Sequence, residues 1–158
     1  MKRYLKIATL VLGVLVIALA TTRAEASSCS QAALAGKWTY TYSGTIFTPN
    51  GAFPLASVGH FHQDGAGNLQ GAQARSVAGS SGVEDISGTI TVNPDDCSAT
   101  GTVNVLVGGQ LQRTAILALA YDQDANHMRA IFESLTLPNG TSLPVVITID
   151  GYRVNTKN

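Results

Sequence analysis

The chain has 158 residues, of which 45% are hydrophobic and only 13% are charged, with ten basic and ten acidic side chains. This length suffices for one domain with a small core. Because no basic patch stands out, the composition gives no reason to expect nucleic acid or an anionic membrane as a partner.

Residues 1–26 have the three parts of a secretory signal peptide. A positive start, MKRYLK, is followed by an apolar run at 7–20 and by the small-residue sequence AEA at 24–26. The run is shorter than the roughly 20 apolar residues that a membrane-spanning helix requires. We therefore predict cleavage after Ala26, a secreted or periplasmic location, and a single domain over residues 27–158.

Cleavage at that point leaves six basic and nine acidic residues, a net charge of −3, and two cysteines. In an exported protein an even pair of cysteines indicates a disulfide. A bond between Cys29 and Cys97 would close a long loop, which the chain-entropy view values at roughly 4 kcal/mol. A metal-binding or redox pair is the alternative, but the C-x-x-C spacing typical of those roles is absent.

The remaining chain is rich in Gly, Thr, Val and Ser and alternates apolar with polar residues, which favours strands over helices. In KWTYTYSGTIF, for example, Trp38, Tyr40 and Tyr42 share one face. Strands are expected at 37–47, 56–63, 69–77, 83–92, 99–107, 110–121, 128–137 and 143–154. Turn-forming sequences separate them, among them DGAGN at 64–68, GSSG at 79–82, NPDD at 93–96 and GG at 108–109.

Short connections and the lack of a sustained 3.6-residue apolar period after residue 26 indicate an all-β domain. Eight antiparallel strands in sequence order close naturally into an up-and-down barrel, because closure removes exposed edges. A β-sandwich of two four-stranded sheets is the alternative, since periodicity alone does not separate the two.

The start of this domain resembles calycin-type barrels. GKW at 36–38 is similar to the G-x-W with which lipocalins begin their first strand, and residues 29–39 are similar to the opening of avidins. The resemblance implies a barrel whose first-strand tryptophan plugs one end. Avidins have Asn where Tyr40 stands and several further tryptophans where this chain has only Trp38, so biotin binding is not implied. The turn DGAGN and the stretch VNPDDCSATGTV are similar to small exported bacterial proteins of unknown function.

An eight-stranded barrel leaves an interior able to hold one small ligand. A binding module for a small hydrophobic or amphipathic molecule is therefore the leading hypothesis, with Trp38, Tyr40, Tyr42, Phe61 and Arg113 as candidate ligand-binding residues. The alternative is a structural or interaction protein whose interior is filled by its own side chains. The binding module and the structural protein differ in one observable, which is whether side chains fill the barrel interior.

Arg113 stands in register with apolar residues of its expected strand, so it either faces the interior or reaches water near the strand end. In the interior its guanidinium needs an acidic partner. Glu133, Asp85 and Glu84 are available, and such an arginine could also hold a ligand carboxylate.

His60 and His62 lie two residues apart on an expected strand and so point to the same face. With His127 as a third ligand they form a minor metal-site hypothesis. The alternative is that both histidines face water while Phe61 points into the core.

The sequence contains no G-x-S-x-G nucleophile motif and no phosphate-binding loop, and we predict no cofactor. A barrel enzyme of the cyclase or isomerase type is the least supported function.

Overall fold

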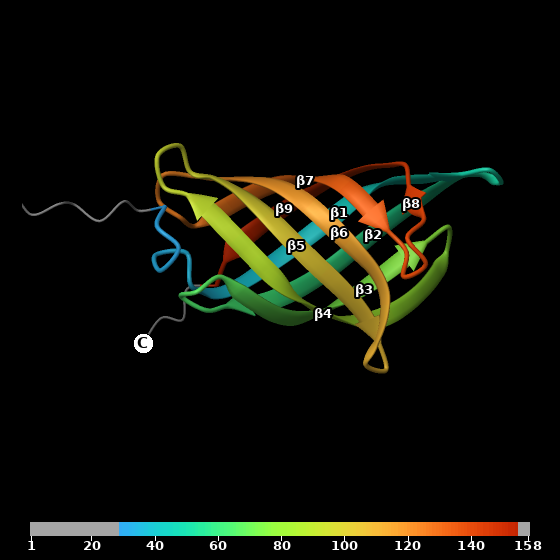
Figure 1. The fold of residues 1–158 in the computed structure, drawn as a ribbon, viewed down its shortest axis with the longest axis horizontal. Coiled ribbons are helices and arrows are strands. Elements are labelled where there is room, and N and C mark those ends of the chain that lie inside the picture. Colours follow the sequence, from blue (N-terminus) through green and yellow to red (C-terminus); the bar gives the residue numbers. More distant parts are fainter. Residues whose placement is uncertain (1–28, 155–158) are drawn as a thin grey trace, which may run out of the picture.

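The computed structural model describes residues 29–154 (Figure 1). Within that range no helix has the length and hydropathy needed to cross a bilayer. The predicted signal peptide at residues 1–26 lies outside the described residues. The strands are β1 (Gly36–Thr48), β2 (Gly51–Gln63), β3 (Asn68–Val77), β4 (Ser80–Asn93), β5 (Ser98–Val107), β6 (Gln110–Tyr121), β7 (His127–Thr136), β8 (Ser142–Leu143) and β9 (Val145–Arg153).

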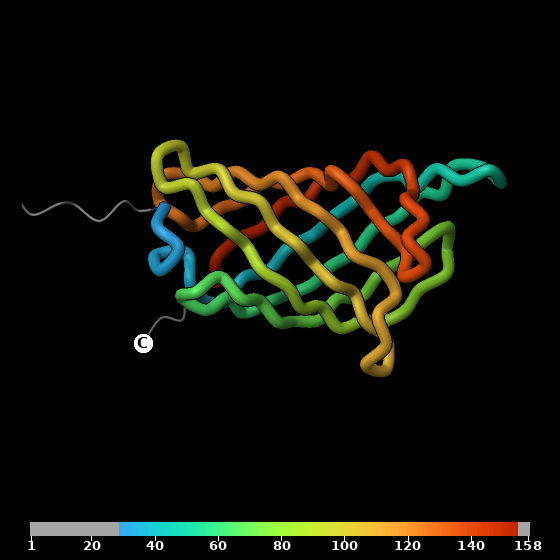
Figure 2. The backbone as a smooth tube through the Cα atoms, in the orientation of Figure 1, coloured from blue at the N-terminus to red at the C-terminus, as the bar shows by residue number. Residues whose placement is uncertain are grey.

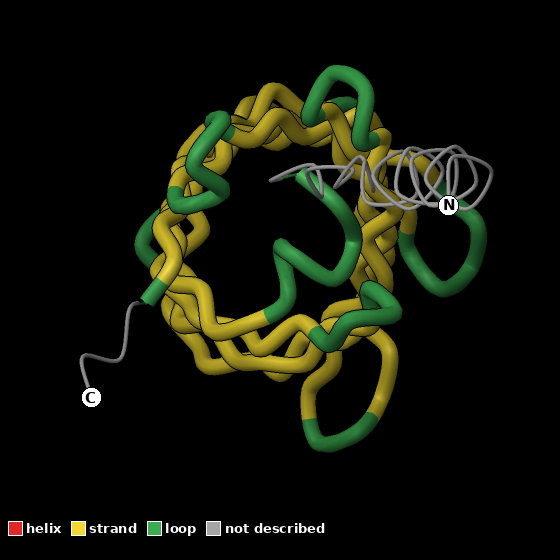
Figure 3. The backbone as a smooth tube through the Cα atoms, turned by 90° about the vertical axis from the view of Figure 1, so that its left-hand side faces the viewer, coloured by secondary structure: helices red, strands yellow, loops and turns green. Residues whose placement is uncertain are grey.

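Eight of these strands close into a ring, which Figure 3 shows along its axis. The hydrogen-bonded order runs from β1 through β2, β3, β4, β5, β6, β7 and β9 and back to β1, and every pairing is antiparallel. The short strand β8 pairs with β7 alone. The predicted up-and-down barrel is confirmed, and the sandwich is excluded because the β9–β1 and β6–β7 pairings join what would be open edges.

The turn between β3 and β4 is tighter than the sequence predicted. The predicted turn at 79–82 is wrong, because β4 begins at Ser80, which pairs with Val77. Ala78 and Gly79 form a two-residue loop with φ of 48° and 88°. Positive φ at both central positions is what a type I′ turn requires, and its twist matches that of the paired strands.

Pro144 divides the last predicted strand. The sequence predicted one strand over 143–154, whereas β8 ends before Pro144 and pairs with β7, and β9 begins after it and pairs with both β1 and β7. Proline has no N–H to donate to a neighbouring strand. Its carbonyl accepts a bond from the amide of Phe47 at 2.9 Å, so the break still contacts β1.

The β1–β2 hairpin is longer than predicted. The second strand begins at Gly51 rather than Ala56, and its pairing with β1 continues to Thr48 and Gly51. Strand β3 pairs with β2 only from Leu55 onward. The hairpin tip therefore projects beyond the rest of the barrel (Figure 2).

Residues 29–35, which we call the plug segment, fold back across one end of the barrel (Figure 3). Leu34 is fully buried, and its carbonyl oxygen accepts a hydrogen bond from Trp38 Nε1 at 3.1 Å. The plug implied by the first-strand tryptophan is thus built from Trp38 together with the segment that precedes β1.

Two further links hold the plug segment in place. Cys29 and Cys97 form the predicted disulfide, which ties the segment to the turn between β4 and β5. The Gln31 side chain donates to the carbonyl of Ile90 at 2.9 Å and accepts from the amide of Val92 at 3.1 Å. These bonds satisfy backbone groups of β4 that face the barrel end.

Candidate functional site

The barrel interior holds a cavity of about 50 Å³, counted as the space open to the centre of a water molecule. Pockets for drug-sized ligands span about 300–1,000 Å³, so side chains fill most of this interior. The lining comes from all eight strands of the ring: Tyr40, Tyr42, Phe61, Leu69, Gln73, Ile86, Ile90, Val103, Val105, Arg113, Ala115, Leu117, Leu119, Met128, Phe132 and Ile149. Only Gln73, Arg113 and the two tyrosine hydroxyls bring polar atoms to it.

Aromatic rings form one wall of the cavity. The rings of Tyr40 and Tyr42, adjacent inward positions of β1, are stacked with centroids 6.4 Å apart. Phe132 of β7 meets Tyr42 edge-on at 5.7 Å, and Phe61 of β2 lies 6.0 Å from Tyr40. Such arrangements add to the stability that burial of the rings provides.

Trp38 is fully buried but lies outside the cavity lining. It stacks on Phe61 with centroids 6.3 Å apart and meets Tyr121 edge-on at 5.6 Å. These three rings form an aromatic layer between the plug segment and the cavity. Trp38, predicted to bind ligand, therefore helps to close the end of the barrel.

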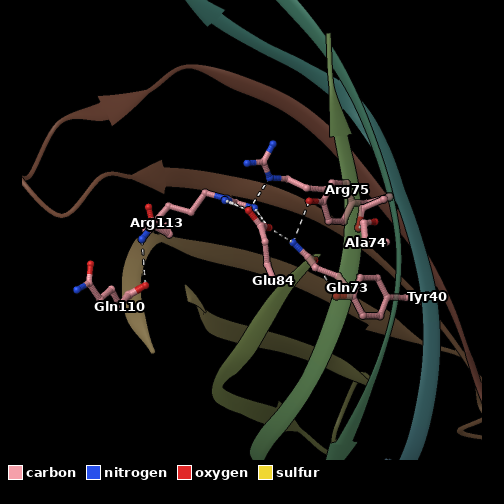
Figure 4. A network of polar contacts seen from close by, with 10 residues as sticks. Tyr40, Gln73, Ala74, Arg75, Glu84, Gln110 and Arg113 are labelled. Atoms are coloured by element: carbon pink, nitrogen blue, oxygen red, sulfur yellow. Dashed lines mark hydrogen bonds and ion pairs between the residues drawn. The ribbon is translucent and has the colours of Figure 1, made fainter. Parts of the chain in front are cut away.

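A polar network lies inside the barrel around Glu84, whose side chain is 1% exposed (Figure 4). Arg113 binds this carboxylate with two parallel bonds, Nη1 to Oε1 at 2.8 Å and Nη2 to Oε2 at 2.5 Å. Arg75 Nε donates to Oε1 at 2.5 Å. Of the three acids available to Arg113, the fold selects Glu84, and the Arg113 side chain is only 16% exposed.

Gln73 joins this network to the tyrosines of β1. Its Nε2 donates to Glu84 Oε2 at 2.8 Å and to the Tyr42 hydroxyl at 3.2 Å, and its Oε1 accepts from the Tyr40 hydroxyl at 2.8 Å. Glu84 thus receives four donors, which is about the number that a carboxylate can accept. The network satisfies its own polar groups and leaves the cavity with an apolar character.

The network sets the protonation of its members. Burial alone would raise the pKa of Glu84, but hydrogen bonds from Arg113, Arg75 and Gln73 lower it to about 2. Burial also raises the pKa of Tyr40, with Tyr42 and Glu84 adding to the effect. At neutral pH Glu84 is therefore ionised and Tyr40 keeps its proton.

Gly59 makes room for the Tyr40 ring that faces it across the β1–β2 pair. A Cβ at Gly59 would lie 2.6 Å from the ring's Cζ and hydroxyl oxygen. We expect Gly59→Ala to displace Tyr40 from Gln73 and to lower the free energy of unfolding by about 1–3 kcal/mol, measured by urea denaturation. Gly82→Ala, where nothing lies within 4 Å, is the control and should change stability by less than about 0.5 kcal/mol; equal losses would contradict the packing argument.

His60 and His62 lie on the outer wall of β2, where both side chains are exposed. Phe61 between them points inward and is 4% exposed. The strand thus alternates between the wet and the dry face, as the solvated interpretation of the two histidines predicted.

His127 belongs to a different part of the outer wall. Its Nε2 bonds to Asp150 Oδ1 at 2.7 Å, and its ring stacks on Tyr152 with centroids 4.5 Å apart. Between β7 and β2 lie β9 and β1, so His127 and His60 are three strand spacings of about 4.8 Å apart. Across residues 29–154, no three side chains of His, Cys, Asp or Glu are grouped so that they could share a metal ion.

Sequence reasoning did not identify Gln73 and Arg75 as interior residues. A signal was present on β3. Leu69, Gly71 and Gln73 occupy alternate positions of the strand, so Gln73 lies on the same face as the buried Leu69. Glu84 carried the same signal, since it precedes Ile86 and Ile90 at even spacing on β4. Polar residues at inward positions of β3 and β4 could therefore have indicated an interior polar network, but this signal was not used, and it would not have shown which residues pair.

The sequence matches no family model and no curated protein. Among solved structures, a redesigned β-barrel, mFAP1, solved bound to DFHBI, is similar with a TM-score of 0.50 and 18% identity, covering 81% of this chain and 100% of that one. Rv2717c from M. tuberculosis has a TM-score of 0.37 and 14% identity, covering 77% of this chain and 93% of that one. The similarity to mFAP1 is at the level of the fold, and it confirms the closed eight-stranded barrel that the resemblance to lipocalins and avidins implied.

Proposed function

We propose that this protein is an exported barrel that binds a small, uncharged, apolar molecule in its interior. The supporting observation is the cavity itself, which is lined almost wholly by apolar side chains. The guanidinium of Arg113, the one charged group of the lining, already holds Glu84 with two bonds. A ligand carboxylate would have to displace Glu84, so an uncharged ligand fits this interior better.

The cavity volume limits the size of the ligand. An engineered cavity of about 150 Å³ in another protein binds benzene, and this cavity is about 50 Å³. Met128 lines the cavity, and an unbranched methionine side chain adapts to irregular spaces. A ligand as large as benzene would therefore enter with rearrangement of side chains such as Met128. The ligand-bound barrel mFAP1 is an example of this architecture with a small molecule bound.

Thermal melting with benzene, and with hexanoate as a charged comparison, tests the proposal. Benzene should raise the Tm of the wild type by mass action, and hexanoate should not. Ala115→Leu fills the cavity from β6 and should abolish the shift, whereas Ala118→Leu, on the outer side of the same strand, should retain it. Equal shifts in the two variants would place the bound benzene outside the cavity.

A native mass spectrum of the protein from its exporting host looks for the natural ligand. A bound mass that disappears on denaturation supports the proposal. A clean apo mass, together with no benzene shift, would favour the second candidate, a structural or interaction protein, which the small cavity volume supports.

Export forms a separate part of the proposal. The Cys29–Cys97 disulfide supports it, because such bonds persist in oxidising compartments. N-terminal sequencing of the protein from the medium or periplasm should begin at Ser27; a start at Met1 would contradict cleavage.

A further inference from the structure

The hydrogen bonds of the interior network run in one direction, which Glu84 sets. Its carboxylate is ionised and held by two arginines, so both of its oxygens only accept hydrogen bonds. Gln73 must therefore turn its amide nitrogen toward Glu84, and Nε2 lies 2.8 Å from Oε2 (Figure 4). The reverse orientation would place the amide oxygen against the carboxylate, where two acceptors repel each other. The charge of Glu84 thus fixes the orientation of the Gln73 amide.

This orientation decides what the two tyrosine hydroxyls can do. Gln73 Oε1 accepts the proton of Tyr40 at 2.8 Å. Gln73 Nε2 also donates to the hydroxyl oxygen of Tyr42 at 3.2 Å, so Tyr42 is an acceptor in this bond. A tyrosine hydroxyl has one proton to donate as well. The oxygen of Tyr42 therefore has a partner in the network, but within residues 29–154 no group accepts its proton.

The Tyr42 hydroxyl lies at the interior cavity. Tyr42 is 6% exposed and lines the cavity together with Gln73 and Arg113. Apart from Tyr40, the remaining lining consists of hydrocarbon side chains and one methionine, so it offers no oxygen to the Tyr42 proton. A buried donor without an acceptor costs free energy. A molecule in the cavity that carries an acceptor removes this cost.

We propose that the ligand carries a carbonyl group and that the Tyr42 hydroxyl donates a hydrogen bond to its oxygen. This inference rests on the proposed binding of a small uncharged molecule in the barrel, and it adds the polar group and the orientation of that molecule. The carbonyl points toward Tyr42 and the polar network, while the hydrocarbon part packs against the aliphatic lining. Tyr42 is then the residue that determines specificity, whereas the proton of Tyr40 is already bound to Gln73.

Water and alcohols compete for the same proton. The cavity of about 50 Å³ has room for water in the ligand-free barrel, because one water needs about 10–15 Å³ of such volume. A ligand that displaces ordered water without replacing its hydrogen bond loses affinity. An alcohol replaces the bond but brings a proton of its own, and Glu84 already receives four donors. A carbonyl accepts a hydrogen bond and needs no acceptor in return.

Calorimetric titration with cyclopentanone and methylenecyclopentane tests the proposal on the protein isolated from exporting cells. The two molecules have the same shape, and only cyclopentanone has an oxygen. Tyr42→Phe should reduce the preference for cyclopentanone, taken as the ratio of the two Kd values, about tenfold, as expected for the loss of one hydrogen bond. Tyr40→Phe removes a hydroxyl from the same wall and is the matched control. Its ratio should stay within about twofold of the wild type.

A second measurement detects the hydrogen bond in the wild type itself. The infrared carbonyl stretch of bound cyclopentanone should lie at a lower frequency than in hexane, because a hydrogen bond weakens the C=O bond. In Tyr42→Phe the band should return toward its position in hexane. A band at the hexane position in the wild type would overturn the proposal. So would a lowered band that persists in Tyr42→Phe, because Arg113 would then be the donor.

The hydrocarbon ligand separates this proposal from the proposed function. If methylenecyclopentane binds but the ratio of Kd values is equal in the wild type and Tyr42→Phe, the cavity takes apolar molecules and the role of Tyr42 is wrong. An equal fall of the ratio in Tyr40→Phe also contradicts that role. If neither molecule binds the wild type, the proposed function and this inference are both wrong.

Discussion

Replacing Glu84 by glutamine is expected to lower the free energy of unfolding by about 3–5 kcal/mol, the usual cost of removing one partner from a buried ion pair. The substitution keeps the size of the side chain and removes its charge. It leaves the guanidiniums of Arg113 and Arg75 inside the barrel without the carboxylate that receives both. Denaturant unfolding at pH 7 measures the loss.

The neighbouring acid provides a matched control. Asp85 follows Glu84 on β4 but faces the outer wall and is exposed. Asp85→Asn removes the same charge from the same strand and should change stability by less than about 0.5 kcal/mol. If the two substitutions cost the same, the interior network contributes nothing beyond net charge.

The effect of Glu84→Gln should also depend on pH. The pKa of Glu84 is lowered from 4.5 in the unfolded chain to about 2 in the barrel. A carboxyl with a depressed folded-state pKa contributes stability that is complete above the unfolded value and is lost as pH falls through the folded value. The difference between wild type and Glu84→Gln should thus be full above pH 4.5 and shrink as the pH falls toward 2. A difference that stays constant over this range would contradict the assigned ion pair.

Removing the disulfide with Cys29→Ser/Cys97→Ser is expected to lower the free energy of unfolding by roughly 4 kcal/mol. The reason is that the unfolded chain regains the conformational freedom of a long loop. The bond spans 68 residues and anchors the plug segment to the β4–β5 turn. The two serines leave no unpaired thiol, since the described residues contain no other cysteine. Urea denaturation compares the variant with the wild type.

Trp38 reports whether the plug segment itself has moved. Its indole donates to the carbonyl of Leu34 within that segment. A red-shifted emission in the folded double variant would show the barrel end opening. If the emission is unchanged while the free energy of unfolding falls by the full roughly 4 kcal/mol, the disulfide acts by constraining the unfolded chain. A fall below about 1 kcal/mol would contradict the argument that closing a long loop stabilises the protein.

Much of the local structure could be predicted from the sequence. Alternation at Trp38, Tyr40 and Tyr42 identified the buried face of β1, and the Gly108-Gly109 pair identified a hairpin loop. Less local features were missed. The β3–β4 turn was placed too late because Ala78, rather than a Gly or Asn, adopts positive φ. Cross-strand pairing in the barrel holds Ala78 in a conformation that its own preference does not favour.

The interior site was also partly predictable from the alternation of residues along each strand. Tyr40, Tyr42 and Phe61 were expected inside and lie there, because inward and outward positions alternate along a strand. Arg113 was left open between the interior and water, and the structure places it in the cavity lining. The acidic partner of Arg113 was left open among three residues. Glu84 lies two strands away on β4 and meets Arg113 only because the register places Arg113 opposite Val105 and Val105 opposite Ile86.

By itself the sequence determined that the chain forms alternating strands with one buried face and a Cys29–Cys97 disulfide. These properties depend on side chains near one another in the chain or on simple counting. Only the tertiary structure decided that the strands close into a ring, that Arg113 faces the interior and binds Glu84, and that the cavity is small. Each of these depends on which strands pair and in which register, and that choice minimises the free energy of the whole barrel rather than of any one segment.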